Sequence, residues 1–186
     1  MAQINIEELL PLLEESGKLA IWDSEATGLK GDYNSLLCSS IKAFGGKTVT
    51  HTVERPGKDR LLCVATKREL EKYVCWISFY GRGYDLPMLN TRLLFHGLEP
   101  VRPRLHLDMY WALKNKILTA RKSQAHLLRW LELPTQKMDL SAEEWNRILE
   151  DFPKARPTMI ARCESDVEGL ESLYKRTKHL IRDVRR

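Results

Sequence analysis

The sequence has no apolar run that approaches the roughly 18 residues needed to cross a membrane. Its first residues also lack the basic and then apolar layout of a signal peptide. We therefore expect a protein without membrane contact, in the cytoplasm or another reducing intracellular compartment.

Cysteine pairs with metal-binding spacing are also missing. Most of the four cysteines lie inside apolar runs, and none forms a C-x-x-C pair, so we interpret them as reduced core residues. They are Cys38, Cys63, Cys75 and Cys163. The chain has no internal repeat, linker or low-complexity segment. We expect one domain over residues 1–186, which is long enough to bury a core without disulfides.

Charge is distributed unevenly along the chain. The net charge is +5, yet residues 1–34 contain seven acids against two lysines, a balance of −5, which leaves +10 for the remainder. An acidic site within a basic protein suits an enzyme that binds a polyanion around metal ions. Many proteins with a pI near 9 bind no nucleic acid, so this indication is weak by itself.

The first third of the chain predicts a helix followed by three consecutive strands. Apolar spacing favours a helix over 5–16 and a buried strand over 18–24. Two further strands, Leu36–Phe44 and Lys47–Val53, flank Gly45-Gly46, which is a hairpin signature. These three strands open a sheet.

The rest of the chain alternates helical and strand patterns. We predict a short helix capped at Thr66, a strand over 74–80, a helix over 84–97, a strand over 105–108, two or three helices over 109–132, a helix capped at Ser141, a break at Pro153 and Pro157, and a long helix from Thr158 to about Arg182. The expected fold class is α/β, a mixed sheet of about five strands flanked by helices.

Four carboxylates lie at the edges of these core elements. Asp23 and Glu25 end the first strand two positions apart, so they share a face and are too close to ionise comfortably without a counter-ion. An isolated D-x-E is more often a solvated turn, but Asp85 lies at a strand-to-helix junction and Asp166 beside the apolar stripe of the last helix. Four such acids could hold two hard cations, Mg²⁺ or Mn²⁺.

Three stretches resemble the motifs of the DEDD superfamily of 3'-5' exonucleases, whose fold is RNase-H-like. Residues 23–29, DSEATGL, resemble its D-x-E-T-T-G-L motif, residues 77–89 its second motif and residues 161–170 its third. The three motifs resemble above all those of the proofreading domains of family-B DNA polymerases and their stand-alone relatives. The resemblance covers residues 18–175, which leaves no room for a polymerase.

This resemblance implies a two-metal phosphodiester hydrolase. Asp23, Glu25, Asp85 and Asp166 would be both the catalytic residues and the ligands of two Mg²⁺ or Mn²⁺ ions. The substrate would be the 3' end of single-stranded DNA and the products nucleoside 5'-monophosphates. RNA stays open as a substrate, and a polymerase or replication partner is not determined by the sequence.

The sequence departs from the family where a general base is expected. The family has a tyrosine four residues before the last aspartate or a histidine five before it, whereas this chain has Arg162 and Ala161. Arginine stays charged and cannot be the base. On a helix Arg162 would pair with Asp166, reach the substrate phosphate, or form a plain surface ion pair. The departure motivates an alternative, a nucleic-acid-binding or partner-binding module with weakened catalysis.

Three further residues are candidates for substrate contact or for support of the ligands. Tyr80 replaces the family's asparagine and could stack on the terminal base, although an aromatic that ends a buried strand is as often core. His106 and Asp108 resemble the family's H-x-D, either as a substitute base or, for the histidine more often, as a satisfied residue near the core.

Two basic clusters are candidates for backbone contact. Lys114, Lys116, Arg121 and Lys122 follow the fifth predicted strand. A second run near the C-terminus includes Lys175, Lys178 and three arginines, Arg182, Arg185 and Arg186. Such runs are more often solvated than bound to phosphate.

Overall fold

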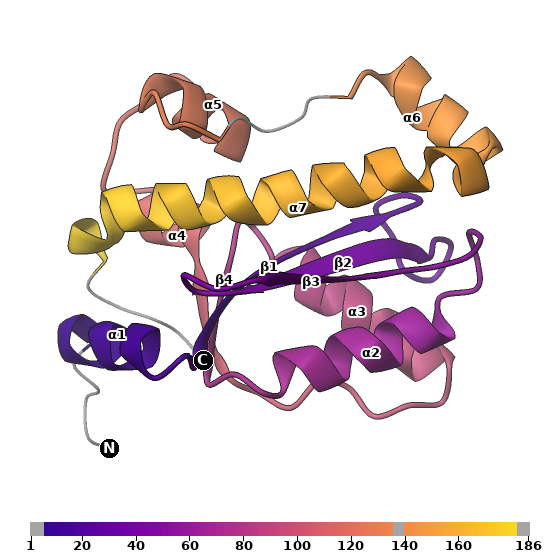
Figure 1. The fold of residues 1–186 in the computed structure, drawn as a ribbon, viewed down its shortest axis with the longest axis horizontal. Helices are drawn as coiled ribbons and strands as arrows, with labels where there is room; N and C mark the ends of the chain where they lie inside the picture. The colour runs from indigo at the N-terminus through magenta and orange to yellow at the C-terminus, as the bar shows by residue number, and fades with distance from the viewer. Residues whose placement is uncertain (1–5, 136–139, 182–186) are drawn as a thin grey trace.

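The computed structural model describes residues 6–135 and 140–181. They form a five-stranded mixed sheet with helices on both faces (Figure 1). The strands are β1 (Leu19–Ala26), β2 (Leu36–Ala43), β3 (Thr48–Thr52), β4 (Cys75–Ser78) and β5 (Leu105–Asp108). Their order is β3-β2-β1-β4-β5, in which β1, β2 and β3 pair antiparallel and β4 and β5 add parallel to β1. The predicted fold class is confirmed.

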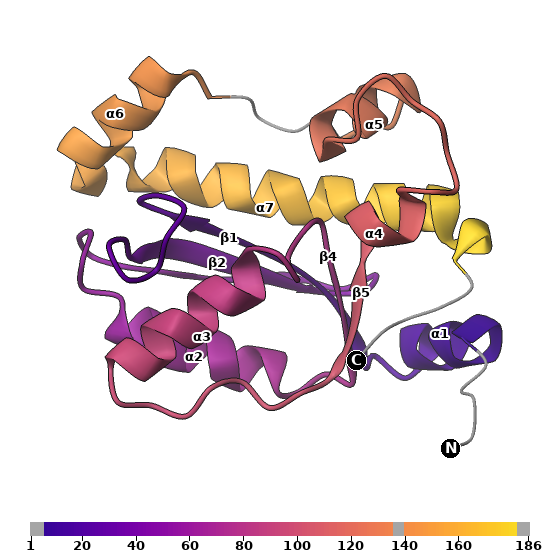
Figure 2. The same ribbon diagram turned by 180° about the vertical axis from the view of Figure 1, so that it is seen from behind.

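The helices form layers above and below this sheet. They are α1 (Ile6–Glu15), α2 (Arg60–Leu70), α3 (Asp85–Phe95), α4 (Met109–Leu113), α5 (Gln124–Trp130), α6 (Ala142–Glu150) and α7 (Phe152–Thr177), followed by a 3-10 turn, Lys178–Leu180. Helix α7 runs along one face of the sheet, and α2 and α3 cover the other (Figures 1 and 2). Helices α5 and α6 pack on the outer side of α7.

Strand β1 is buried on both faces. Its alternating side chains enter two apolar clusters, Leu19 and Ile21 on one side of the sheet and Ala20 and Trp22 on the other. The apolar stripe of α7 is shared between them, with its C-terminal part in the first cluster and its N-terminal part in the second. The strand extends to Ala26, two residues beyond the predicted end, so both of its acids lie within the strand.

Two predicted helix starts are wrong. Helix α2 begins at Arg60, and Thr66 is a buried residue in its interior rather than a cap. Helix α7 begins at Phe152 and continues through Pro157, where a break was predicted. Pro153 lies in the first turn, which needs no intrahelical donor, and Pro157 is exposed, so the carbonyl that loses its partner faces water. Burial of Phe152 and Met159 favours this longer helix.

Other local predictions are confirmed. Ser141 and Glu144 form the predicted capping box of α6. All four cysteines are free and buried. Within the described ranges, no helix is both long and apolar enough to span a membrane.

A buried ion pair ties α2 and α3 to the start of β2. Arg92 donates from Nε and Nη2 to the two carboxylate oxygens of Asp59 at 2.8 and 2.9 Å, and the Leu36 amide donates to the same carboxylate at 3.0 Å. Burial opposes ionisation, but the hydrogen bonds from Arg92 and His96 hold the pKa of Asp59 below its usual range. Asp59, Cys63 and His96 lie close enough together to share an ion. Arg92 already neutralises that group.

Replacement of Arg92 by leucine should destabilise the folded protein, because the Asp59 carboxylate would keep a buried charge with fewer hydrogen-bond donors. We expect Arg92→Leu to lower the free energy of unfolding by about 3 kcal/mol, measured by urea denaturation. The matched control is Arg147→Ala, which removes an ion pair to Glu143 that is mostly exposed. Its effect should be too small to resolve. Equal losses in the two variants would contradict a special role for the buried pair.

Candidate active site

Three carboxylates from two elements converge at the end of β1. Asp23 and Glu25 come from this strand and Asp166 from α7, and their oxygen atoms lie within 4.8 Å of one another. We call these three residues the acidic cluster. Asp23 and Glu25 are half-buried and Asp166 is fully buried. Three of the four predicted carboxylates therefore meet, although they are separated by up to 143 positions in the chain.

Helix α7 holds Asp166 against the strand by burying its neighbours. Cys163 and Val167 are fully buried between α7 and the sheet. The Cys163 thiol donates to the Asp23 carbonyl at 3.5 Å, which links helix and strand beside the cluster. On the other side, Gln124 of α5 donates to the Asp166 carbonyl at 2.8 Å. The position of Asp166 thus follows from the packing of the helix.

The fourth predicted acid, Asp85, lines the same cleft but faces Ser24. Its Oδ1 atom accepts hydrogen bonds from the Ser24 amide at 3.0 Å and the Ser24 hydroxyl at 2.5 Å. Asp85 is the first residue of α3 and is buried. Burial, together with the nearby charge of Glu25, raises its pKa to about 7 against the opposing hydrogen bonds of Ser24. This carboxyl therefore gains or loses its proton near neutral pH.

Arg162 of α7 lines the cleft and pairs with Glu25 of β1. Its Nε donates to Glu25 Oε1 at 2.6 Å, and each side chain is 14% exposed. The prediction of a plain surface ion pair is therefore wrong. Burial would lower the pKa of the guanidinium, but Glu25, then Asp166 and Asp23, hold it above its usual value. A fixed positive charge thus stands beside all three acids.

Two members of the acidic cluster, Asp23 and Glu25, line a cleft of about 200 Å³, whereas the fully buried Asp166 is not part of its lining. Five of its lining residues were predicted as ligands or substrate contacts, namely Asp23, Glu25, Tyr80, Asp85 and Arg162, and the other three are Ser24, Phe79 and Tyr84. Sequence reasoning missed Ser24, Phe79 and Tyr84 as cleft residues. The signal was their position next to predicted acids and in the second motif, at the end of β4 and the start of α3.

Asp108 fixes the loop that carries Tyr80. Its carboxylate accepts from the amides of Tyr80 at 2.9 Å, Arg82 at 3.0 Å and Tyr110 at 3.1 Å. Tyr80 has a backbone φ angle of 64°, which is unusual for a residue other than glycine. Its ring is 45% exposed, so it is not a core residue, and it lines the cleft. Asp108 therefore acts on the cleft through the backbone of this loop.

His106 lies in the core behind the cleft. It is 3% exposed, its Nε2 is 2.7 Å from the Ser78 hydroxyl, and its ring packs edge-on against Trp76. Burial, and then the charge of Arg82, lower its pKa to about 4, so the ring is neutral at pH 7. His106 does not line the cleft, and its role as a substitute base stays a prediction without geometric support.

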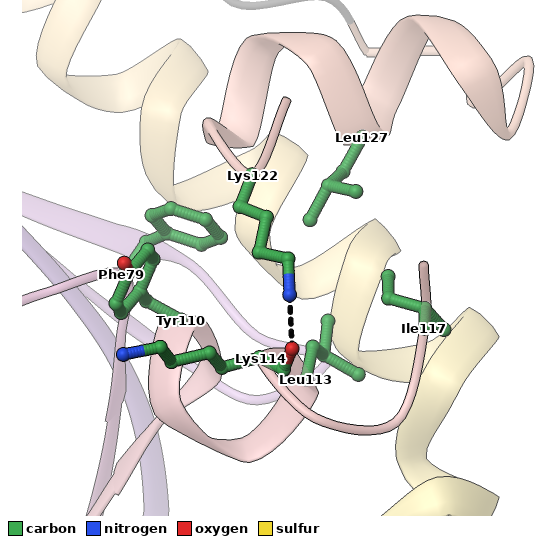
Figure 3. Close-up of a pocket in the computed structure, with 7 residues that line it drawn as sticks. All are labelled: Phe79, Tyr110, Leu113, Lys114, Ile117, Lys122 and Leu127. Carbon is green, nitrogen blue, oxygen red and sulfur yellow. Dashed lines mark hydrogen bonds between the residues drawn. The ribbon is translucent and has the colours of Figure 1, made fainter. Parts of the chain in front are cut away.

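The predicted basic cluster after β5 divides into two parts. Lys116 and Arg121 are exposed, and the Lys114 ammonium lies 4.5 Å from the Trp111 ring. Lys122 instead enters an apolar recess, where its ammonium donates to the Lys114 carbonyl (Figure 3). The Lys122 ammonium is therefore engaged in a contact within the fold. Lys114, Lys116 and Arg121 keep their charges toward solvent.

Part of the C-terminal basic run is also engaged. Lys175 pairs with Glu171 at 2.7 Å, and Lys178 pairs with Glu14 at 2.8 Å. The arginines of the same run, Arg182, Arg185 and Arg186, lie outside the described residues. The two lysines stabilise contacts of α7 and α1.

Comparison with known proteins identifies the fold. Residues 20–178 match the family model described as the RNase_H superfamily. A family B DNA polymerase from the hyperthermophilic archaeon Pyrobaculum calidifontis is similar in structure, with a TM-score of 0.67 and 14% sequence identity. The match covers 86% of this chain and 24% of the polymerase chain, so this chain spans about a quarter of its length. Among curated proteins, none matches the sequence.

Removal of the Arg162 charge should strengthen the binding of divalent cations to the acidic cluster. Arg162→Gln removes the guanidinium charge that pairs with the Glu25 carboxylate. We therefore expect the Kd for Mn²⁺ or Mg²⁺ to fall about tenfold in isothermal titration calorimetry. Arg162→Lys keeps the charge and is the matched control. Identical metal affinity in the two variants and the unaltered protein would contradict this competition.

The buried Asp85 carboxyl should make stability decrease as pH rises. Its pKa is raised in the folded state, so the folded protein holds the proton more tightly and unfolding becomes easier between about pH 4 and pH 7. Asp85→Asn cannot ionise and should be more stable than the unaltered protein at pH 8 by roughly 3 kcal/mol, measured by urea denaturation in EDTA. The advantage should vanish near pH 4. A difference independent of pH would contradict this origin.

Proposed function

The chain belongs to the RNase H superfamily, and we propose that it is a metal-dependent 3'-5' exonuclease of the DEDD type. The observation that carries the proposal is the convergence of Asp23, Glu25 and Asp166 at the end of β1, where Asp23 and Glu25 line a cleft together with Asp85. The proposed substrate is the 3' end of single-stranded DNA, with RNA as the open alternative, and the products are nucleoside 5'-monophosphates. We also propose that residues 1–186 form a single exonuclease domain.

The donor set of the acidic cluster suits hard divalent cations. Carboxylate oxygens are the ligands that Mg²⁺ and Mn²⁺ prefer, and the three residues of the acidic cluster each offer one such oxygen within 4.8 Å of the others. Two such ions, when bound, would activate the attacking water and stabilise the departing 3' oxygen. Asp85 lines the same cleft and would contribute its Oδ2 atom, since its Oδ1 atom already accepts from Ser24.

The remaining residues of the cleft orient the substrate. Phe79, Tyr80 and Tyr84 present aromatic surface beside the acids, which suits a sugar or base. The Tyr84 hydroxyl donates to the Gly28 carbonyl at 3.0 Å and so joins the loop after β1 to α3. Arg162 lines the same cleft and would donate to the scissile phosphate of a bound substrate. Arginine binds phosphate well but cannot remove a proton from water.

The second candidate is a binding module with weakened turnover. The Arg162–Glu25 ion pair favours it, because the charged guanidinium occupies one proposed ligand. The retained carboxylates favour the enzyme, because buried acids destabilise the fold unless cations or protons neutralise them. General-base assistance typically contributes only about 10²- to 10⁴-fold, so absence of the family's base would reduce catalysis without abolishing it.

Incubation of a 5'-labelled single-stranded oligonucleotide with Mg²⁺ or Mn²⁺ should give a ladder of products shortened from the 3' end. Asp23→Asn and Asp166→Asn should lower the rate at least a thousandfold, because each removes a charged ligand. The matched control is Glu168→Gln, an exposed acid on α7 two residues beyond Asp166, which should cleave at the normal rate.

The same gel separates the two candidates. An intact full-length band with either metal, from protein that still binds the oligonucleotide, would support the binding module and contradict the enzyme. Release of the 5' label as a mononucleotide without a ladder of longer products would show cleavage from the 5' end and contradict the proposed polarity. Equal rates on DNA and RNA would leave the chemistry intact and overturn only the preference for DNA.

A further inference from the structure

An exposed group of aromatic rings lies next to the cleft. Tyr80 follows β4, and Tyr110 and Trp111 begin α4. The Tyr110 ring centroid lies 5.2 Å from that of Tyr80 and 5.1 Å from that of Trp111, nearly perpendicular to both. The Tyr80 and Trp111 rings lie within 30° of parallel at 6.4 Å. We call Tyr80, Tyr110 and Trp111 the aromatic shelf.

The shelf presents its outer rings to solvent although large aromatic side chains are usually buried. Tyr80 is 45% exposed and Trp111 48% exposed. Tyr80 also adopts a backbone conformation that is costly for a residue with a side chain. Exposure and strain together indicate that this arrangement serves something other than the stability of the core.

One buried carboxylate accepts hydrogen bonds from both segments of the chain that form the shelf. Asp108 is 3% exposed, and its Oδ1 accepts from the amides of Tyr80 at 2.9 Å and Tyr110 at 3.1 Å. The ring of Tyr80 lies directly over Gly83, where a Cβ atom would come within 2.7 Å of it. The shelf is therefore fixed before any ligand arrives, which lowers the entropic cost of binding.

The shelf joins the cleft at one end and a cation at the other. Tyr80 belongs to the lining of the cleft as well as to the shelf. The Lys114 ammonium lies 4.5 Å from the centre of the Trp111 ring. Lys122 donates to the Lys114 carbonyl from the recess behind, and the two ammonium groups point apart in Figure 3. Lys114 is thus held beside the outer ring with its charge available.

Flat apolar rings beside a cation match the chemistry of single-stranded nucleic acid. Unpaired bases stack on aromatic side chains, and their phosphates attract lysine. In a duplex the faces of the bases are already covered by their neighbours. A strand whose 3' end lies in the cleft would pass over Tyr80 and then Trp111.

We propose that the aromatic shelf binds the unpaired nucleobases that precede the 3'-terminal nucleotide. Tyr80 and Trp111 stack on these bases and Lys114 contacts the phosphate between them, so the shelf selects single strands over duplexes. This inference rests on the proposed function, because it takes the 3' end to lie beside the acidic cluster. It assigns the basis of substrate choice to residues outside the carboxylate set.

The test measures binding without cleavage. The anisotropy of a 5'-fluorescein-labelled single-stranded DNA octamer is recorded in EDTA, with the unaltered protein and with Trp111→Ala, Tyr80→Ala and Lys114→Ala. We expect each aromatic variant to weaken binding about tenfold, and the lysine variant to reduce the dependence of Kd on salt by about one ion. Trp130→Ala is the matched control, because Trp130 is 53% exposed on α5 and outside the shelf. It should bind normally.

A second oligonucleotide distinguishes bases from backbone. With abasic sites at the second and third nucleotides from the 3' end, the unaltered protein should bind as weakly as Trp111→Ala binds the intact strand, and the variant should lose nothing further. An equal effect of Trp111→Ala on both oligonucleotides would overturn stacking, as would normal binding by the variant or no binding by the unaltered protein. The last result would point to a protein partner for these rings.

The two proposals fail separately. Selective binding in EDTA with no cleavage in Mg²⁺ or Mn²⁺ would retain the shelf and reject the exonuclease. Cleavage that is unaffected by Trp111→Ala and proceeds equally on blunt duplexes would retain the exonuclease and reject the shelf.

Discussion

The mutual repulsion of carboxylates at the end of β1 is the constraint on which this structure depends. Asp23, Glu25 and Asp166 are brought within 4.8 Å by elements that gain far more from burial than the acids lose. Strand β1 enters apolar clusters on both faces, and α7 buries a continuous stripe against the sheet. The core therefore holds the acids in place, and their proximity is the basis on which we propose that they bind cations. A less buried strand and helix would let the acids separate.

Arg162 is where this chain resolves the same repulsion differently from the motif that it resembles. Its guanidinium reaches Glu25 at 2.6 Å and remains charged among three acids. The position expected to hold a base thus holds a permanent cation, which both competes with metal ions and offers a contact for phosphate. Asp85 uses a second solution, since its pKa near 7 permits it to keep a proton. Neutralisation by an arginine and by a proton lets the cleft fold in the absence of metal.

Two other buried acids serve the cleft from outside it. Asp59 binds Arg92, which in turn donates to the Gly31 carbonyl at 3.1 Å, so the loop after β1 is attached to α3. Asp108 accepts three backbone amides and so places Tyr80 at the border between cleft and shelf. In both cases a carboxylate replaces missing backbone partners of an irregular loop. The rim of the cleft is therefore as well fixed as its floor, although it consists of loops.

The sequence by itself determined the α/β class, the positions of the five strands along the chain and the paired acids of β1, because the alternation of apolar residues and the D-x-E spacing are local properties. It also indicated that Asp85 and Asp166 belong with them, through motifs rather than physics. Local signals failed at Thr66 and Pro157, where burial of neighbouring residues outweighed a capping pattern and a proline. Only the tertiary structure decided that Arg162 meets Glu25, that Asp85 turns to Ser24, and that Tyr80 and Trp111 form one surface. These contacts join segments far apart in the chain, so their geometry depends on how the sheet and α7 pack.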